Sequence, residues 1–317
     1  MSPAPPPLTE AGDFRALCRK VSNWGRWGAD DQRGTLNLVT PERVLEARDA
    51  IVDGTVVPLG IPLGGDGPQG TSPNPRRFDP IHLMTQLPHE HIREGAVGAS
   101  DDVLILPLQA GTQWDALAHM AHEGQLYGGR SVDHVTSDGA EVCSIEEISD
   151  RLVTRALLLD VARAEGVEHL PAGFAIDDRV LTRCLEQQGS DLRSGDVLLI
   201  RTGWLEHCRK SAWEGFTATE SPGLDISVLP LLHDAGAAGV ASDTSAVEVK
   251  PSPVPGQTLP FHIAALVYMG LLLGEIFDLE RLAALAASDG RYDGMLVAPP
   301  LPVRRAVGSP VNPYVIR

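Results

Sequence analysis

Residues 102–119 read DVLILPLQAGTQWDALAH and place an apolar run directly before a segment with polar side chains. The apolar part, 102–108, has the length and composition of a strand that is buried on both faces of a sheet. Later runs of the same form lie at 156–161, 196–202 and 238–243. We therefore expect all of these runs to be strands of one buried sheet.

Helical patterns separate these runs. An acidic or capping residue opens three of them, at Asp177 to Gln188, Asp225 to Asp234 and Leu279 to Ala287. Thr40 followed by Pro41 predicts a further helix that ends at about Asp53. Strands that alternate with helices are typical of an α/β domain with at least partly parallel strand pairing.

Two segments are predicted to lack regular structure. The stretch 64–79, GGDGPQGTSPNPRRFD, is rich in Gly, Pro and Asn, which favours an irregular loop. A long loop within a compact chain often covers a site. The Pro-rich residues 1–12 are expected to form a disordered tail, so 13–317 is predicted to be a single domain.

The composition excludes several classes of protein. With 26 Lys and Arg against 42 Asp and Glu, the net charge is −16, and no basic cluster offers a footprint for nucleic acid. The longest apolar run, Ile263 to Leu273, is shorter than the roughly 20 residues that cross a bilayer. The cysteines show no paired spacing, which is typical of free thiols in a reducing compartment. We expect a cytoplasmic protein that binds a small molecule.

The polar segment that follows the run 102–108 holds candidate ligands for a metal ion. Gln109, Gln113, Asp115 and His119 lie on the predicted bend, where side chains from the end of a strand can converge. Asp and His bind Zn²⁺ or Mn²⁺ well, whereas a Gln carbonyl is a weaker ligand. The alternative is that Asp115 caps a helix and His119 lies on its surface.

A second pair of ionisable residues brackets an apolar segment. His262 precedes IAALVYMGLLLG, and Glu275 follows it. Buried ionisable groups need partners, so each is expected in a salt bridge, in hydrogen bonds or at a metal ion. Arg201 and Asp243 also follow predicted strands and are candidates to line a pocket, although Asp243 could equally cap a turn.

Aromatic and histidine residues provide further candidates. Trp114 stands between two proposed ligand positions and is therefore expected to contact the substrate. Trp24 is a candidate for stacking on an aromatic substrate, with a role as a hydrophobic anchor as the alternative. The histidines at positions 82, 89 and 91 lie beyond the Gly- and Pro-rich loop and are expected to be solvated, in a segment that could form a lid or a subunit contact.

The run from Gln109 to His119 resembles the signature HxGTHxDxPxH of the cyclase family that includes bacterial kynurenine formamidases. Other segments are similar to a longer branch of that family: NWGRWGADDQRGTLN (23–37), LYGG (126–129), LIRTGW (199–204), GEIFDLE (274–280) and GSPVNP (308–313). The resemblance implies a swivelling β/β/α fold, with a mixed, barrel-like sheet and outer helices. It also implies a homodimer or homotetramer.

The resemblance also implies a ligand set for one divalent ion. The family's metal-binding aspartate falls on Asp115, its final motif histidine, a ligand and general base, on His119, and its distal histidine and glutamate on His262 and Glu275. The first two motif histidines are replaced here by amides, Gln109 and Gln113, and the proline by Leu117. The loss of imidazole ligands weakens zinc binding and makes Mn²⁺ or Mg²⁺ the better match for the remaining oxygen-rich set.

Three functions follow from this resemblance. The first is hydrolysis of a small amide, formamide, lactone or cyclic imide by metal-activated water, with His119 or Glu275 moving the proton. The second is a metal-independent cyclase or dehydratase of secondary metabolism, of the aromatic polyketide type, in which the two glutamines donate hydrogen bonds to an enolate oxygen. The third is a protein that binds a small molecule without catalysis.

Overall fold

The computed structural model describes residues 11–90 and 98–317. Helix α1 begins at Ala11, so the last two residues of the predicted tail are helical, and the rest of that tail lies outside the described residues, as does His91. Within the described ranges, no helix is long and apolar enough to cross a membrane. All four cysteines are buried and free, as predicted.

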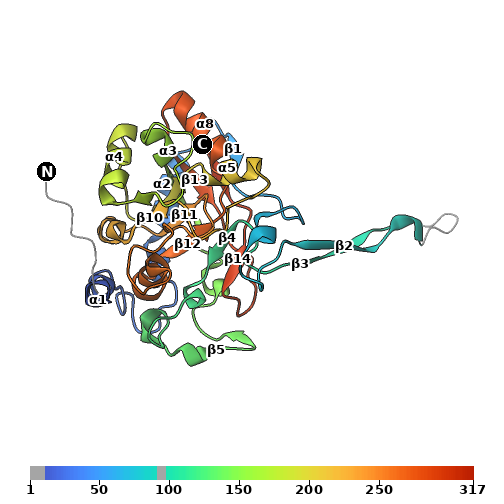
Figure 1. The fold of residues 1–317 in the computed structure, drawn as a ribbon, viewed down its shortest axis with the longest axis horizontal. Helices are drawn as coiled ribbons and strands as arrows, with labels where there is room; N and C mark the ends of the chain where they lie inside the picture. The colour runs from blue at the N-terminus through green and yellow to red at the C-terminus, as the bar shows by residue number, and fades with distance from the viewer. Residues whose placement is uncertain (1–10, 91–97) are drawn as a thin grey trace.

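A mixed nine-stranded sheet forms the centre of the molecule and curls into a half-barrel (Figure 1). In spatial order its strands are β1 (Val56–Pro58), β15 (Tyr314–Ile316), β13 (Asp293–Val297), β7 (Val153–Asp160), β9 (Val197–Arg201), β11 (Gly239–Ser242), β12 (Leu272–Glu275), β4 (Gln113–Asp115) and β14 (Gly308–Pro310). The expected fold class, a mixed and barrel-like sheet with outer helices, is confirmed.

The central strands of the sheet run parallel. Strands β7, β9, β11 and β12 pair parallel in that order, whereas the flanking strands pair antiparallel. The predicted runs at 156–161, 196–202 and 238–243 are therefore strands of one sheet, and β9 and β11 are buried along their whole length. Parallel strands covered on both faces are apolar throughout, which is why these runs were recognisable.

Helices cover both faces of this sheet. One core cluster packs α1, α4, α6 and the π-helix η9 against the inner residues of the sheet, and a second packs α8 against the opposite face. The helices are α1 (Ala11–Lys20), α2 (Pro41–Asp49), α3 (Val161–Ala164), α4 (Asp178–Gln188), α5 (Trp204–Lys210), α6 (Leu229–Ala235), α7 (Pro260–His262), η9 (Ile263–Met269) and α8 (Glu280–Asp289). The predicted helices are present, although α2 ends four residues early.

Helix α4 illustrates why these segments are helical. Asp177 caps its first turn by accepting a hydrogen bond from the backbone N–H of Val180. Gly189 ends the helix at φ 61°, in the left-handed region that glycine adopts without steric cost. The cap and the stop signal are both local, so the sequence alone located this helix to within one residue.

The prediction for the first apolar run, 102–108, is wrong. Strand β3 (Asp101–Ile105) pairs only with β2 (Ile81–Gln86), and this hairpin extends from the body as an arm (Figure 1). Every residue of β3 is exposed. An apolar run shows that a strand needs covering, but not what covers it. The strand that enters the main sheet is instead the polar segment β4 (Gln113–Asp115), which was predicted to be a bend.

Candidate metal centre

Two neighbouring antiparallel strands carry the polar side chains of the site. In the pairing of β4 with β12, Gln113 lies opposite Glu275 and Asp115 opposite Leu273. Because side chains alternate along a strand, Gln113, Asp115 and Glu275 project from the same face of the sheet. All three are buried.

Two histidines approach this face from neighbouring segments. His262 ends α7, and its Nε2 lies 3.2 Å from Oε1 of Glu275 and 3.9 Å from Oδ2 of Asp115. His119 ends a short 3₁₀ turn, Leu117–His119, and its Nε2 lies 3.9 Å from the other carboxylate oxygen of Asp115. Asp115 therefore does not cap a regular helix. The structure brings the polar segment 109–119 together with His262 and Glu275, which lie far away in the sequence.

The oxygen atoms at the centre of this cluster lack hydrogen-bond partners. Both carboxylate oxygens of Asp115 and Oε1 of Gln113 are buried and accept no hydrogen bond from the described residues. Such atoms are rare in folded proteins, because leaving a buried acceptor unsatisfied costs about 1–3 kcal/mol. Ligand atoms of Asp115, His262 and Glu275 lie within 4.8 Å of one another. The donor set and the unsatisfied oxygens both fit a divalent cation.

The orientation of the Gln113 amide follows from its neighbour. Its Nε2 donates to Oε2 of Glu275 at 2.8 Å. A carboxylate can only accept, so the amide nitrogen faces Glu275 and the amide oxygen is the free atom. Gln109 also reaches this part of the sheet: its Nε2 would lie 2.6 Å from a Cβ built on Gly308, the residue opposite Asp115. The absence of a side chain at Gly308 leaves room for the Gln109 amide.

Glu248 belongs to the site and was not identified from the sequence. Its carboxylate accepts hydrogen bonds from the backbone N–H of His262 and pairs with the Nδ1 of the same residue. A carboxylate behind a ligating histidine fixes the orientation of the ring and raises its basicity. The signal in the sequence is an acid between two valines, VEV at 247–249.

Burial and hydrogen bonds shift the pKa values in opposite directions. Burial raises the pKa of Asp115, which has no hydrogen bond to offset the cost of its charge. Burial opposes the charge of His262, but hydrogen bonds to Glu248 and Glu275 outweigh it and raise the pKa of His262 to about 10. Burial would also raise the pKa of Glu275, yet its hydrogen bond with His262 lowers it. Without a metal ion the cluster therefore favours a proton on His262, which an ion bound at Nε2 would displace.

The loop 64–79 lies against the candidate site. The side chain of Gln69 donates to the backbone oxygen of Gln109 at 3.1 Å. The positive charge of Arg77 opposes the effect of burial, which raises the pKa of Asp115, and adds to the effect of His262, which lowers the pKa of Glu275. The expectation that this loop covers a site is consistent with the contact of Gln69 and with the charge effect of Arg77.

The two candidate tryptophans do not contact the cluster. Trp114 is fully buried on the opposite face of β4, where it packs on Phe277 and donates to the backbone oxygen of Ala298. Its predicted role in substrate binding is corrected: alternation along the strand turns it into the core. Trp24 stacks on Tyr268, at a centroid distance of 5.3 Å, and donates to the backbone of Val267. Trp24 is therefore an anchor at η9.

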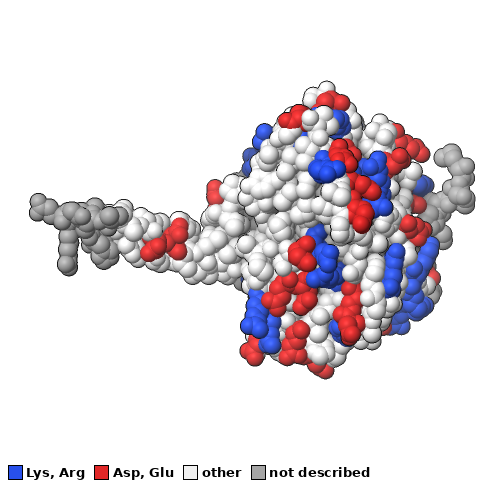
Figure 2. Space-filling view, turned by 180° about the vertical axis from the view of Figure 1, so that it is seen from behind, with Lys and Arg blue, Asp and Glu red and all other residues white. Residues whose placement is uncertain are grey.

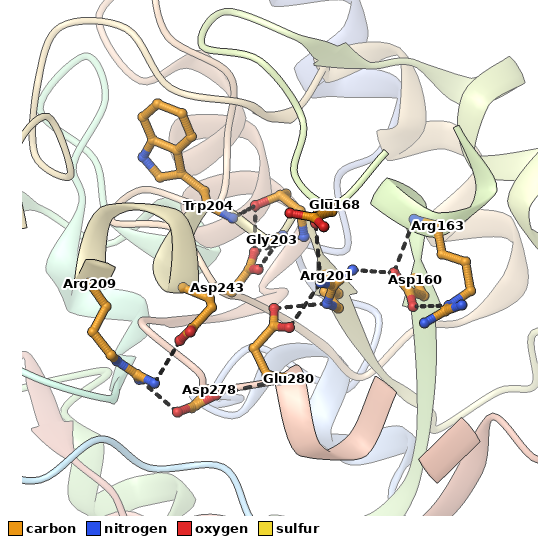
Figure 3. A network of polar contacts seen from close by, with 12 residues as sticks. Asp160, Arg163, Glu168, Arg201, Gly203, Trp204, Arg209, Asp243, Asp278 and Glu280 are labelled. Atoms are coloured by element: carbon orange, nitrogen blue, oxygen red, sulfur yellow. Dashed lines mark hydrogen bonds and ion pairs between the residues drawn. The ribbon is translucent and has the colours of Figure 1, made fainter. Parts of the chain in front are cut away.

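Arg201 and Asp243 belong to a separate polar network (Figure 3). Arg201 pairs with Asp160 at 2.7 Å and with Glu280 at 2.9 Å. It lines a cavity of about 620 Å³ whose walls include none of the six candidate ligands. Asp243 accepts hydrogen bonds from Thr202 and from the backbone N–H of Gly203, so it holds the turn after β9.

Comparison with known proteins matches this chain to one family. The sequence pattern of the Cyclase family matches residues 57–249. A solved structure described as a novel cyclase is 35% identical, with a TM-score of 0.87 over 94% of this chain and 100% of the other. No curated protein matches the sequence.

More distant structures share the fold alone. Isatin hydrolase A from Ralstonia solanacearum is 18% identical, with a TM-score of 0.61 over 88% of this chain and 98% of its own. Isatin hydrolase A from Labrenzia aggregata is 17% identical, with a TM-score of 0.60 over 86% of this chain and 96% of its own.

Proposed function

The chain belongs to the Cyclase family, and on that premise we propose that it is a metal-dependent hydrolase of a small amide, formamide, lactone or cyclic imide. The observation that carries the proposal is the pair of Asp115 oxygens, buried beside His262 and Glu275 without hydrogen-bond donors among the described residues. A buried carboxylate in this state is costly unless it binds a cation. Proteins named isatin hydrolases share the fold, but the proposal rests on residues of this chain.

Asp115, His262 and Glu275 would hold the ion, with the amide oxygen of Gln113 beside them. This set offers oxygen atoms and one imidazole and no thiolate, which suits Mn²⁺ or Mg²⁺ better than structural zinc. A bound divalent ion would supply a water of lowered pKa and polarise a substrate carbonyl.

His119 is suited to move protons at this site. Its side chain is 19% exposed, whereas those of Asp115, His262 and Glu275 are almost fully enclosed. An imidazole that reaches solvent can take a proton from water, pass it to the leaving group and exchange it with bulk. Both carboxylate oxygens of Glu275 are engaged, by Gln113 and His262, so Glu275 would bind and orient rather than shuttle.

The contacts of Gln113 bear on the alternative of a metal-independent cyclase. That reaction requires free hydrogen-bond donors for an enolate oxygen. The Gln113 amide nitrogen already donates to Glu275, and its free atom is an oxygen, which attracts a cation and repels an enolate. The contacts of Gln113 therefore favour the hydrolase.

The test is hydrolysis of a panel of formamides, lactones and cyclic imides by the full chain. We expect turnover after dialysis against Mn²⁺ and removal of free ion, loss of turnover with a chelator, and loss in the His119→Ala variant. Undiminished turnover in chelator would support the cyclase reading and contradict the proposal. Binding of a panel compound without product would support the non-catalytic alternative.

We further propose that the chain forms a homodimer through its hairpin arm. Apolar residues on and next to the arm are between 39% and 49% exposed: Phe78, Ile81, Leu83, Met84, Val103, Leu104 and Ile105. The arm shows few charged atoms in the face seen in Figure 2. An isolated two-stranded hairpin is marginally stable in water. A second copy would cover both arms at once across a two-fold axis, which suits a permanent apolar interface.

A further inference from the structure

A lysine without an ion-pair partner lies next to the cluster. Glu248 and Lys250 are two residues apart in an extended segment, bridged to Leu224 and Ser221, so both side chains project from the same side. Glu248 contacts His262 on that side. Lys250 Nζ makes one hydrogen bond, 3.5 Å from the hydroxyl of Ser245, and no carboxylate of the described residues lies within 4.0 Å of it. Burial accordingly lowers the pKa of Lys250.

The charge of an arginine from a different segment acts on the same groups. Arg77 lies on the loop 64–79, and its charge acts on Asp115, on Glu275 and on Lys250. Within the described part of the chain, its guanidinium forms no ion pair within 4.0 Å. Two cations from distant parts of the sequence thus act on one site, and neither has an ion-pair partner among the described residues.

A hydroxyl group beside Lys250 is also unsatisfied. Ser221 and Lys250 exchange both backbone hydrogen bonds, so their side chains lie on the same side of the pair. The Ser221 Oγ is buried and has no partner among the described residues. The ammonium and this hydroxyl are both free to bind a ligand.

Ion pairs with the acidic residues of the site do not explain the presence of Arg77 and Lys250. Where arginine balances a buried acid in this protein, the charged atoms approach closely, as for Arg201 and Asp160 at 2.7 Å. Asp115, Glu248 and Glu275 carry three negative charges, and Arg77 and Lys250 carry two positive ones. With a divalent ion bound and His262 neutral as one of its ligands, the site would carry one surplus positive charge, and such a site favours an anionic ligand.

We propose that Arg77 and Lys250, with the hydroxyl of Ser221, bind a carboxylate group of the substrate beside the proposed metal centre. The identification of this ligand as the substrate and the surplus positive charge both rest on the proposed function; the two unpaired cations and the unsatisfied Ser221 hydroxyl do not. The preferred substrates of the hydrolase would then be amides, lactones or imides that carry a carboxylate near the scissile carbonyl. Neutral compounds of the same shape would bind poorly because they leave the two cations desolvated and unpaired.

The experiment compares two formamides that differ by one carboxylate. Binding of 2-formamidobenzoate and of formanilide to the full chain is measured by calorimetry, in the native protein and in the Arg77→Met and Lys250→Met variants. Arg76→Met and Lys20→Met are matched controls, because both residues are exposed and lie outside the cluster. Thermal melting verifies that each variant is folded. The series is repeated in Asp115→Ala, which removes the proposed metal ligand and keeps both cations.

We expect the native protein to prefer the carboxylate compound by about tenfold or more. Either cation variant should reduce that preference to about threefold or less, while the controls retain it. The preference should persist in Asp115→Ala, because this variant loses one negative charge together with the metal ligand and keeps both cations, so a failed hydrolase proposal would leave the anion site standing. Equal affinity for the two compounds, absence of anion binding, or an unchanged preference in both cation variants would overturn the inference.

Discussion

Two buried aspartates on either side of strand β12, Asp115 on β4 and Asp243 directly after β11, show how a candidate site differs from a structural network. Asp115 and Asp243 are both almost completely buried, and burial raises the pKa of each, for Asp243 to about 6. Asp243 accepts three hydrogen bonds from Thr202 and Gly203, whereas Asp115 accepts none from the described residues. Two aspartates that are equally buried in one sheet therefore differ in whether the chain provides hydrogen-bond donors for their carboxylates.

This difference indicates that Asp243 stabilises the fold, whereas Asp115 is available to bind a ligand. The oxygens of Asp243 are satisfied within the chain, so removing them leaves stranded donors (Figure 3). The oxygens of Asp115 are available to a ligand that the chain does not supply, at an energetic cost that functional sites commonly bear. The sequence made both residues candidates for a site, Asp115 as a metal ligand and Asp243 as a residue that lines a pocket. The hydrogen bonds that each carboxylate accepts distinguish the two residues.

Asp115→Ala should give the largest effect. We expect turnover to fall about 1,000-fold or more, as for loss of a group that acts directly on the reaction. The free energy of unfolding of the metal-free protein should stay the same or rise, because an unsatisfied buried carboxylate is removed. Steady-state kinetics and urea unfolding measure the two quantities. A large loss of stability would show that Asp115 has a structural partner.

Asp243→Ala should show the reverse pattern. The backbone N–H groups of Thr202 and Gly203 would lose their acceptors, at a cost of about 3 kcal/mol in the free energy of unfolding. Metal affinity should match that of the native protein at temperatures where the variant is folded. Urea unfolding and calorimetric titration with Mn²⁺ provide the readouts. Weakened metal binding in the folded variant would show that Asp243 also contributes to the metal site, which contradicts the proposed difference between the two aspartates.

Metal addition should stabilise only proteins that retain Asp115. At about one hundred times the dissociation constant, Mn²⁺ is expected to raise the free energy of unfolding by about 2.7 kcal/mol. The same increment should appear in Asp243→Ala and be absent from Asp115→Ala. Thermal unfolding with and without Mn²⁺ tests this. An equal increment in Asp115→Ala would place the ion elsewhere.

The hairpin arm should yield the smallest change in the stability of the folded chain. Leu83 projects from the arm, half exposed. Leu83→Lys is expected to change the free energy of unfolding of the monomer by no more than about 0.5 kcal/mol, as is usual for surface positions. It should shift the native protein from dimer to monomer in sedimentation or light scattering. A native protein that is already monomeric would refute the proposed dimer.

The sequence predicts the parallel core well and the arm poorly. Strands β7, β9 and β11 are covered on both faces within the chain, so an apolar run specifies them. Strand β3 belongs to a similar apolar run but is exposed, so apolarity alone does not identify what covers a strand. The short strand β4 escaped prediction, since a polar strand enclosed by neighbours has no periodic signal.

The candidate site was predictable where family resemblance reached it. Asp115, His119, His262 and Glu275 were named from the motif and its distal partners, and the structure brings them together. Trp114 was misplaced because β4 was predicted as a bend, so alternation along a strand was not applied. Arg77 and Lys250 were missed because their relevance depends on how a loop and an extended segment fold over the sheet.

Metal content per chain tests the central claim most directly. The native protein, Asp115→Ala and Asp243→Ala are each dialysed against Mn²⁺, freed of excess ion and analysed for bound metal. The account predicts about one ion per chain in the native protein and in Asp243→Ala, and almost none in Asp115→Ala. A native protein that retains no metal, or an Asp115→Ala variant that retains as much as the native chain, would contradict it.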